Sequence, residues 1–224
     1  MQLPGRLDRH QIAIPAGSQL RLGPVRPASV GREDLHHWLA LPVAPSNDDP
    51  MPDATVRLRP IEEADLDVLR RFDTDPSSRG PYLTSGFRSP QARRHRWEED
   101  GWLGTDSGQL GVALPDGTLA GIVSWRSIPT GGPEVGCLEI GALLFPEHRG
   151  QGRGTAAQRL LVEYLFATTL ANRLQAVTNV ENIAEQRVLE RIGFRREGIM
   201  RGLAFDGGRW HDGVLYARLR DDPA

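Results

Sequence analysis

From about residue 54 onward, apolar and polar residues follow strand-like and helix-like periods in turn. Short apolar or alternating runs bounded by Gly, Pro and Asp predict strands. These runs cover 55–58, 109–114, 118–125, 137–145, 173–179, 198–205 and 213–219. Helix-like segments cover 62–72, 90–101, 152–169 and 182–192. Strands and helices interleaved in this order predict an α/β domain with a mixed sheet.

Two features refine this pattern. The run 137–145 is almost continuously apolar and stops at Pro146, which is typical of a strand buried on both faces. The turns Pro115-Asp116-Gly117 and Asp206-Gly207-Gly208 each separate two strand-like runs, so each predicts a β-hairpin.

Residues 1–50 lack such periods, because prolines, glycines and histidines interrupt every apolar run. The stretch 42–50, rich in Pro and Asp, is typical of a linker. We therefore expect an N-terminal arm and linker over 1–53 and one domain over 54–224. The arm could add a strand and a helix to the domain or to a partner subunit, which leaves a homodimer open.

Composition narrows the class of protein. The chain has 224 residues, a formal net charge of −2 and one cysteine, Cys137, so no intrachain disulfide can form. The near-neutral charge provides no field for holding nucleic acid. No apolar run is long enough for a membrane span or a signal peptide, so we expect a cytoplasmic protein without a membrane partner. The histidines lack metal-ligand spacing, and we expect no metal.

The segment 145–155 carries the clearest chemical signal. A buried strand ends, a loop containing Gly150, Gly152 and Gly154 follows, and a helix begins. Backbone N–H groups at a helix start are unpaired and carry partial positive charge, and glycines let a bulky anion approach them. The loop is therefore suited to a pyrophosphate, to which Arg149 and Arg153 could add charged hydrogen bonds.

Two common phosphate-binding patterns fit poorly. The spacing of the glycines differs from the Rossmann G-x-G-x-x-G pattern, and the P-loop needs a lysine, which the chain lacks. A different nucleotide-binding protein with the same loop, or an ordinary tight connection between strand and helix, remains an alternative.

Several motifs in order resemble the GNAT acyltransferase superfamily and its RimJ/RimL branch. Arg-Gly-Gln-Gly-Arg-Gly at 149–154 is similar to the family's pyrophosphate loop, and 182–194 is similar to its N-x-x-S-x-x-[VL]-x-x-x-x-G-F helix. The segments 139–141, 195–198 and 208–212 also fit the branch. The resemblance covers about 54–220 and implies a GNAT-like fold, a mixed sheet flanked by helices and splayed between its fourth and fifth core strands.

The resemblance also implies how acetyl-coenzyme A is held. The backbone of Leu143, Leu144 and Phe145 would pair with the pantetheine arm, and an amide near Leu143 would stabilise the oxyanion of the thioester carbonyl. Loop residues would bind the pyrophosphate and Asn182 would contact the pantetheine region. The complete expected binding set is Leu143, Leu144, Phe145, Arg149, Gly150, Gln151, Gly152, Arg153, Gly154, Thr155 and Asn182.

Two glutamates are the candidate catalytic residues. An amine must lose a proton before it attacks the thioester, and Glu139, a carboxylate within an apolar strand, is the expected base. It could instead pair with an arginine or face solvent. Glu185 stands where the branch has a serine associated with the sulfur, and it could be an acid only with a raised pKa. Asn182 and Glu185 also form a capping-box pattern.

These residues predict an N-acetyltransferase that moves an acetyl group from acetyl-coenzyme A to a primary amine by direct attack in a ternary complex. The acceptor could be a protein N-terminus or a small-molecule amine. The alternative is a non-catalytic module that binds acyl-coenzyme A and regulates a partner, which the departure at Glu185 and the unassigned arm motivate.

Overall fold

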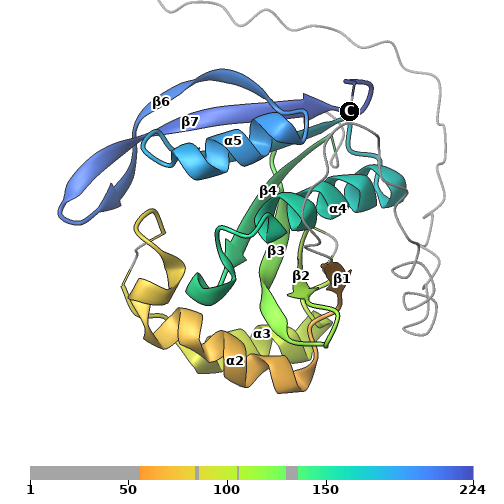
Figure 1. Cartoon of the computed structure of the whole chain (residues 1–224), viewed down its shortest axis with the longest axis vertical. Helices are drawn as coiled ribbons and strands as arrows, with labels where there is room; N and C mark the ends of the chain where they lie inside the picture. Colours follow the sequence, from red (N-terminus) through yellow and green to blue (C-terminus); the bar gives the residue numbers. More distant parts are fainter. Residues whose placement is uncertain (1–55, 84–85, 105, 130–135, 224) are drawn as a thin grey trace, which may run out of the picture. The chain divides into compact units, whose positions relative to one another are not determined.

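A seven-stranded sheet organises the part of the chain that the computed structural model describes, residues 56–83, 86–104, 106–129 and 136–223. The predicted arm, 1–53, lies outside the described residues. The strands lie in the order β1-β2-β3-β4-β5-β7-β6 (Figure 1). Their bounds are β1 Arg57–Arg59, β2 Ser107–Ala113, β3 Leu119–Ser127, β4 Cys137–Leu144, β5 Arg173–Asn179, β6 Arg195–Asp206 and β7 Arg209–Leu219. The pair β4–β5 is parallel and the other pairs are antiparallel, which confirms the mixed sheet.

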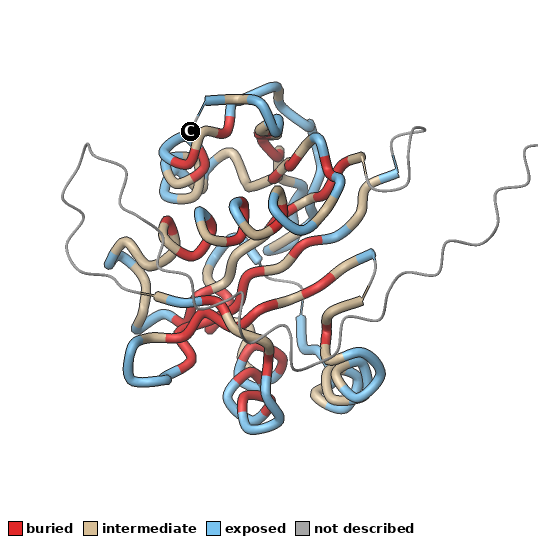
Figure 2. The backbone as a smooth tube through the Cα atoms, turned by 90° about the vertical axis from the view of Figure 1, so that its right-hand side faces the viewer, coloured by how far each residue is buried: buried red, intermediate tan, exposed pale blue. Residues whose placement is uncertain are grey.

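Helices cover both faces of the sheet. They are α2 Glu63–Thr74, α3 Pro90–Asp100, α4 Arg153–Thr168 and α5 Ile183–Arg191, with short 3-10 turns η1 Pro76–Arg79 and η2 Pro146–His148. Apolar residues of α4 and α5 pack in one core with β4 and β5, whereas those of α2 pack with β3 in a second core. Figure 2 shows the buried residues concentrated on the central strands and the inner sides of the helices. None of the described helices is both long and apolar enough to cross a bilayer.

Local sequence explains where the helices begin and end. Glu62 and Asp65 form a reciprocal capping box at the start of α2. Ser89 caps α3, Pro90 occupies its first turn, and Gly101 ends it in the left-handed conformation with φ of +63°. These signals are short-range, so the sequence predicts both helices correctly.

The other predicted elements are confirmed with two changes. The predicted loop 73–89 contains the short helix η1, and the last hairpin has longer arms than the sequence suggests. The expectation that 137–145 is buried on both faces holds only in part, because residues 139 and 141–143 are half-buried. This part of β4 borders a gap in the sheet.

The gap lies between the two parallel strands. β4 and β5 pair only at Cys137–Arg173, Leu138–Leu174 and Glu139–Gln175. Beyond that rung β4 continues beside β3, whereas β5 continues beside β7. The predicted splay between the fourth and fifth strands is therefore present.

Candidate active site

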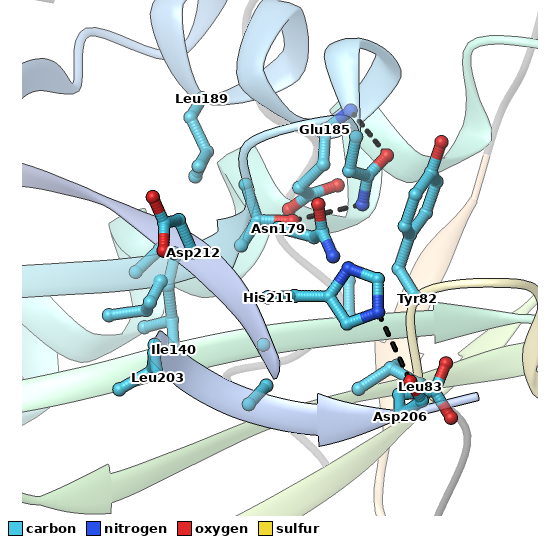
Figure 3. Close-up of a pocket in the computed structure, with 18 residues that line it drawn as sticks. Tyr82, Leu83, Ile140, Asn179, Glu185, Leu189, Leu203, Asp206, His211 and Asp212 are labelled. Atoms are coloured by element: carbon cyan, nitrogen blue, oxygen red, sulfur yellow. Dashed lines mark hydrogen bonds between the residues drawn. The ribbon is translucent and has the colours of Figure 1, made fainter. Parts of the chain in front are cut away.

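A cavity of about 270 Å³ occupies the gap between β4 and β5 (Figure 3). Its walls come from β4, β5, the first turns of α5, the β6–β7 hairpin and the loop after η1. Tyr82 closes one side, since its hydroxyl donates to the carbonyl of Glu181 at 3.0 Å. Elements that are far apart in the sequence therefore line the same cavity.

The register of β4 determines which of its backbone groups face this gap. The N–H of Phe145 donates to the carbonyl of Ala120 at 2.9 Å, and Leu143 lies opposite Ile122 on the same antiparallel ladder. Because hydrogen-bonding directions alternate along such a ladder, the backbone of Leu143 and Phe145 faces β3. The groups of Ala142 and Leu144 face the gap instead. The β4 edge that borders the gap is therefore formed by the backbone of Ala142 and Leu144.

The glycine loop presents unpaired donors at the foot of α4. Gly150 and Gly152 have φ of +70° and +74°, and Gly152 stands at the N-cap without a side-chain cap. The first backbone hydrogen bond at this end of α4 runs from the N–H of Ala156 to the carbonyl of Gly152 at 3.1 Å. Among the described residues, none accepts a hydrogen bond from the N–H groups of 150–155. These donors remain available for a ligand.

Two arginine side chains of the loop contact protein groups in the structure. Arg149 turns inward, donating from Nε to the carbonyl of Leu144 at 2.9 Å and from its terminal nitrogen to the carbonyl of Ser78 at 2.6 Å. Its guanidinium therefore fixes the loop against η1. Arg153 contacts Nδ1 of His148 at 2.8 Å.

Glu139 lies at the last paired rung of β4 and β5. Arg126 donates to its Oε1, from Nε at 2.9 Å, and Gln175 donates to its Oε2 at 3.0 Å. Both carboxylate oxygens already have partners, and the residues that line the cavity begin one position later, at Ile140. The ion pair with an arginine, weighed above as the alternative, is what the structure contains.

Glu185 lines the cavity from the first turn of α5. Its Oε1 accepts a hydrogen bond at 2.9 Å from Nε2 of Gln158, a fully buried residue of α4. Burial raises the pKa of the Glu185 carboxyl group, and the bond from Gln158 lowers it by less. The protonated form is thus favoured more than for an exposed glutamate.

Asn182 caps α5, as the capping-box pattern predicts. Its Oδ1 accepts from the N–H of Glu185 at 3.4 Å, and its Nδ2 donates to the hydroxyl of Thr178 at 2.9 Å. The reciprocal half of the box is missing, because the Glu185 side chain bonds to Gln158 instead. Asn182 also lines the cavity.

Sequence reasoning missed the contribution of the last hairpin. Asp206, His211 and Asp212 line the cavity together with Leu203. Asp212 is fixed there, since its Oδ1 accepts from the N–H of Gly202 at 2.8 Å. The segment 208–212 was noted for its family resemblance, which is the signal that could have pointed to these residues.

Comparisons with known proteins agree with this architecture. A family model described as an acetyltransferase (GNAT) domain matches residues 55–195. The probable N-acetyltransferase YjcK of Bacillus subtilis is 36% identical over 107 residues, 48% of this chain and 58% of YjcK. The chain spans about half of the length of the first curated relatives that it matches, 49–58%.

Two solved structures share the fold. The spermidine N-acetyltransferase of Vibrio cholerae, solved with CoA and spermine, superposes with a TM-score of 0.67 at 18% identity, covering 76% of this chain and 98% of that one. RimL, a ribosomal L7/L12 α-N-protein acetyltransferase solved with coenzyme A, gives 0.63 at 21% identity, covering 76% and 96%. The chain belongs to the GNAT acetyltransferase family, as its RimJ/RimL-like motifs predict.

Proposed function

We propose that this protein transfers an acetyl group from acetyl-coenzyme A to a primary amine within a ternary complex. The observation that carries the proposal is the set of unpaired backbone N–H groups over 150–155, at the N-terminus of α4. This loop follows β4, and a cavity occupies the gap between β4 and β5. A loop of this kind binds diphosphates well, and the gap offers an unpaired strand edge to an extended ligand.

Acetyl-coenzyme A fits this arrangement as the donor substrate. Its pyrophosphate would accept hydrogen bonds from the N–H groups of Gln151, Gly152, Gly154 and Thr155. Its pantetheine amides would pair with the edge of β4 at Ala142 and at the N–H of Leu144, whose carbonyl already accepts from Arg149, and Asn182 would border the same stretch. The thioester would then lie in the cavity, and the amide of Ala142 would donate a hydrogen bond to the developing oxyanion.

Glu185 is suited to protonate the leaving sulfur. The amine nitrogen attacks the thioester carbonyl, and the carbon–sulfur bond breaks as the tetrahedral intermediate collapses. A protonated Glu185 gives its proton to the thiolate and recovers one from the nitrogen. Its half-buried position and raised pKa support this role, which an exposed glutamate could not perform at neutral pH.

The sequence predicts Glu139 as the general base, but the contacts of its carboxylate do not favour this role. Its two oxygens are engaged by Arg126 and Gln175, and the cavity lining starts beyond it.

We propose that the acceptor is an amine that reaches the site in its cationic form. Asp206 and Asp212 line the cavity, and their carboxylates attract a protonated amine before it reacts. The structural neighbours are a spermidine N-acetyltransferase and a ribosomal L7/L12 α-N-protein acetyltransferase. Both carry the primary amine that the proposed chemistry needs.

Two measurements test the proposal. Acetyl-coenzyme A at saturation should raise the Tm of the full chain, because a ligand that binds only the folded state stabilises it. Release of free thiol should then be followed over spermidine, spermine, glucosamine and short peptides with free α-amines. A Tm shift without transfer to any amine would favour the non-catalytic acyl-coenzyme A module, and no shift would contradict the diphosphate site.

A further inference from the structure

Two hydrogen bonds attach the segment 78–82 to opposite sides of the gap between β4 and β5. On the side of β4, Nη2 of Arg149 donates to the carbonyl of Ser78 at 2.6 Å. On the side of β5, the hydroxyl of Tyr82 donates to the carbonyl of Glu181 at 3.0 Å. Arg149 follows the end of β4 and Glu181 follows the end of β5. The segment therefore connects the two strands where they no longer pair with each other.

The attachment at Ser78 is buried and uses the shape of an arginine side chain. Ser78 is 1% exposed, and its hydroxyl donates to the carbonyl of Asp75 at 2.7 Å, which fixes it within η1. Nε of Arg149 also donates to the carbonyl of Leu144, at the edge of β4. Gly80 leaves room for the guanidinium, because a Cβ there would lie 2.9 Å from Nη1 of Arg149. A rigid fork of donors holds two carbonyls in this way, which a lysine ammonium does not reproduce.

The attachment at Tyr82 lies at the cavity itself. Tyr82 is one of the lining residues, and Figure 3 shows its ring next to His211. From Ser78 to Tyr82 the chain advances by four residues, which span at most about 14 Å when fully extended. So short a segment has little slack. Release of either end would allow the two sides of the gap to move relative to each other.

The chemistry proposed above is divided between these two sides. Acetyl-coenzyme A would lie along β4 and the loop 150–155, whereas Glu185 lies on α5, which follows β5. The distance from the Glu185 carboxyl group to the leaving sulfur therefore depends on the width of the gap. Misplacement of reacting groups by about 1 Å can lower a rate about 10²-fold.

We propose that Arg149 and Tyr82 are positioning residues that set the width of this gap and so hold the thioester at reacting distance from Glu185. The proposal rests on the function proposed above. It gives Arg149 a role other than the diphosphate contact expected from the sequence, because its Nε and Nη2 are engaged by protein carbonyls. Arg153 contacts His148 through one terminal nitrogen, so it is the better suited of these two arginines for the diphosphate.

The test compares Arg149→Met and Tyr82→Phe with Arg94→Gln in the full chain. Arg94 is the control because it pairs with Glu63 between α2 and α3, where the side chains are 41% and 70% exposed. With the best amine of the panel, kcat of R149M and of Y82F should each fall about 10- to 10²-fold at temperatures where the variants are folded. The Kd of acetyl-coenzyme A should stay close to the wild-type value. R94Q should match the wild type in both.

Two further variants distinguish positioning from charge. Arg149→Lys keeps the positive charge but not the fork of donors, so its kcat should fall as in R149M. Arg153→Met should instead weaken the binding of coenzyme A, measured by calorimetric titration. The inference would be overturned by a wild-type kcat in R149K. It would also be overturned if R149M lost as much coenzyme A affinity as R153M while its kcat stayed unchanged.

The double variant tests whether the two contacts hold the same segment. Once one end of 78–82 is free, the other contact can no longer set the gap, so R149M/Y82F should lose little more kcat than the more affected single variant. If the two losses multiplied, the contacts would act separately and the inference would fail.

Hydrogen exchange followed by mass spectrometry tests the same connection without an acceptor. We expect faster amide exchange over 181–183 in R149M, because release of Ser78 frees the segment that holds this turn through Tyr82. Unchanged exchange over 181–183 in R149M would overturn the inference. If the wild-type chain acetylates no amine of the panel, the proposed function fails, and the exchange measurement alone decides whether the two contacts hold the gap.

Discussion

Gln158 of α4 and Glu185 of α5 are joined by a 2.9 Å hydrogen bond that connects the two helices beside the cavity. The amide can serve either form of the carboxyl group, because its nitrogen donates to a carboxylate and its oxygen, if the amide turns, accepts from a carboxylic acid. Gln158 is fully buried, so it cannot exchange this partner for bulk water. The site thus contains an acid that is supported in both protonation states.

The raised pKa of Glu185 predicts a pH-dependent cost in stability. The group binds its proton more tightly in the folded chain than in the unfolded chain. Stability is therefore lost as pH rises, from the ordinary pKa of a glutamate up to the raised folded value. In Glu185→Gln this loss is absent. The difference in Tm, variant minus wild type, should grow between pH 4 and pH 8, as measured by thermal melts.

Glu98→Gln is the control for this prediction, because Glu98 is exposed on α3. Its Tm difference should stay flat with pH. A difference for E185Q that is flat, or that falls as pH rises, would contradict the raised pKa of Glu185. In activity, E185Q should lose about 10²-fold or more in kcat with little change in acetyl-coenzyme A binding.

Alanine substitutions at two glycines should separate an effect on stability from an effect on coenzyme A binding. Gly150 and Gly117 both have positive φ, +70° and +90°, and an added Cβ would meet nothing within 4 Å at either position. Alanine at either should cost about 1–2 kcal/mol of backbone strain. Only Gly150→Ala should also reduce the Tm shift caused by coenzyme A, because only its Cβ enters the proposed diphosphate site. Equal ligand shifts in the two variants would place the diphosphate elsewhere.

Local signals account for what the sequence predicts well. The glycine loop, the hairpin turns and the cap at Asn182 each depend on residues within a few positions of one another, and each is present. The mixed sheet follows from the order of the elements, and the splay follows from the family resemblance. These features need no knowledge of distant contacts.

The features that the sequence does not predict depend on contacts between elements that are distant along the chain. The partner of Glu185 lies 27 positions earlier, inside α4, and no spacing rule connects them. The side chain of Arg149 is engaged by Ser78, 71 positions away. The register of β6 on β7 shifts twice, between Arg196 and Gly198 and between Met200 and Ala204, so simple alternation cannot show that His211 faces the cavity.

A buried ion pair joins α2 to α3, the two helices on either side of η1 and the loop that follows it. Asp73 accepts two hydrogen bonds from Arg93, one of them at 2.7 Å, and the side chains are 2% and 12% exposed. The carbonyl of Asp73 also accepts from the N–H of Arg88 at 2.9 Å, which holds the end of the loop. Asp73→Ala leaves a guanidinium unpaired in a mostly buried place, so it should cost about 3–5 kcal/mol.

Glu63→Ala is the matched control for Asp73→Ala, because Glu63 also pairs α2 with α3, through Arg94, but both side chains are well exposed at 70% and 41%. Its loss should stay below about 1 kcal/mol. Urea unfolding of both variants at neutral pH measures the free energies. Similar losses would mean that the buried pair contributes no more than a surface pair. A large loss of stability for Asp73→Ala alone would confirm the larger contribution of the buried pair. A higher KM for the amine in Asp73→Ala, measured at temperatures where this variant is folded, would link the pair to the acceptor side of the cavity.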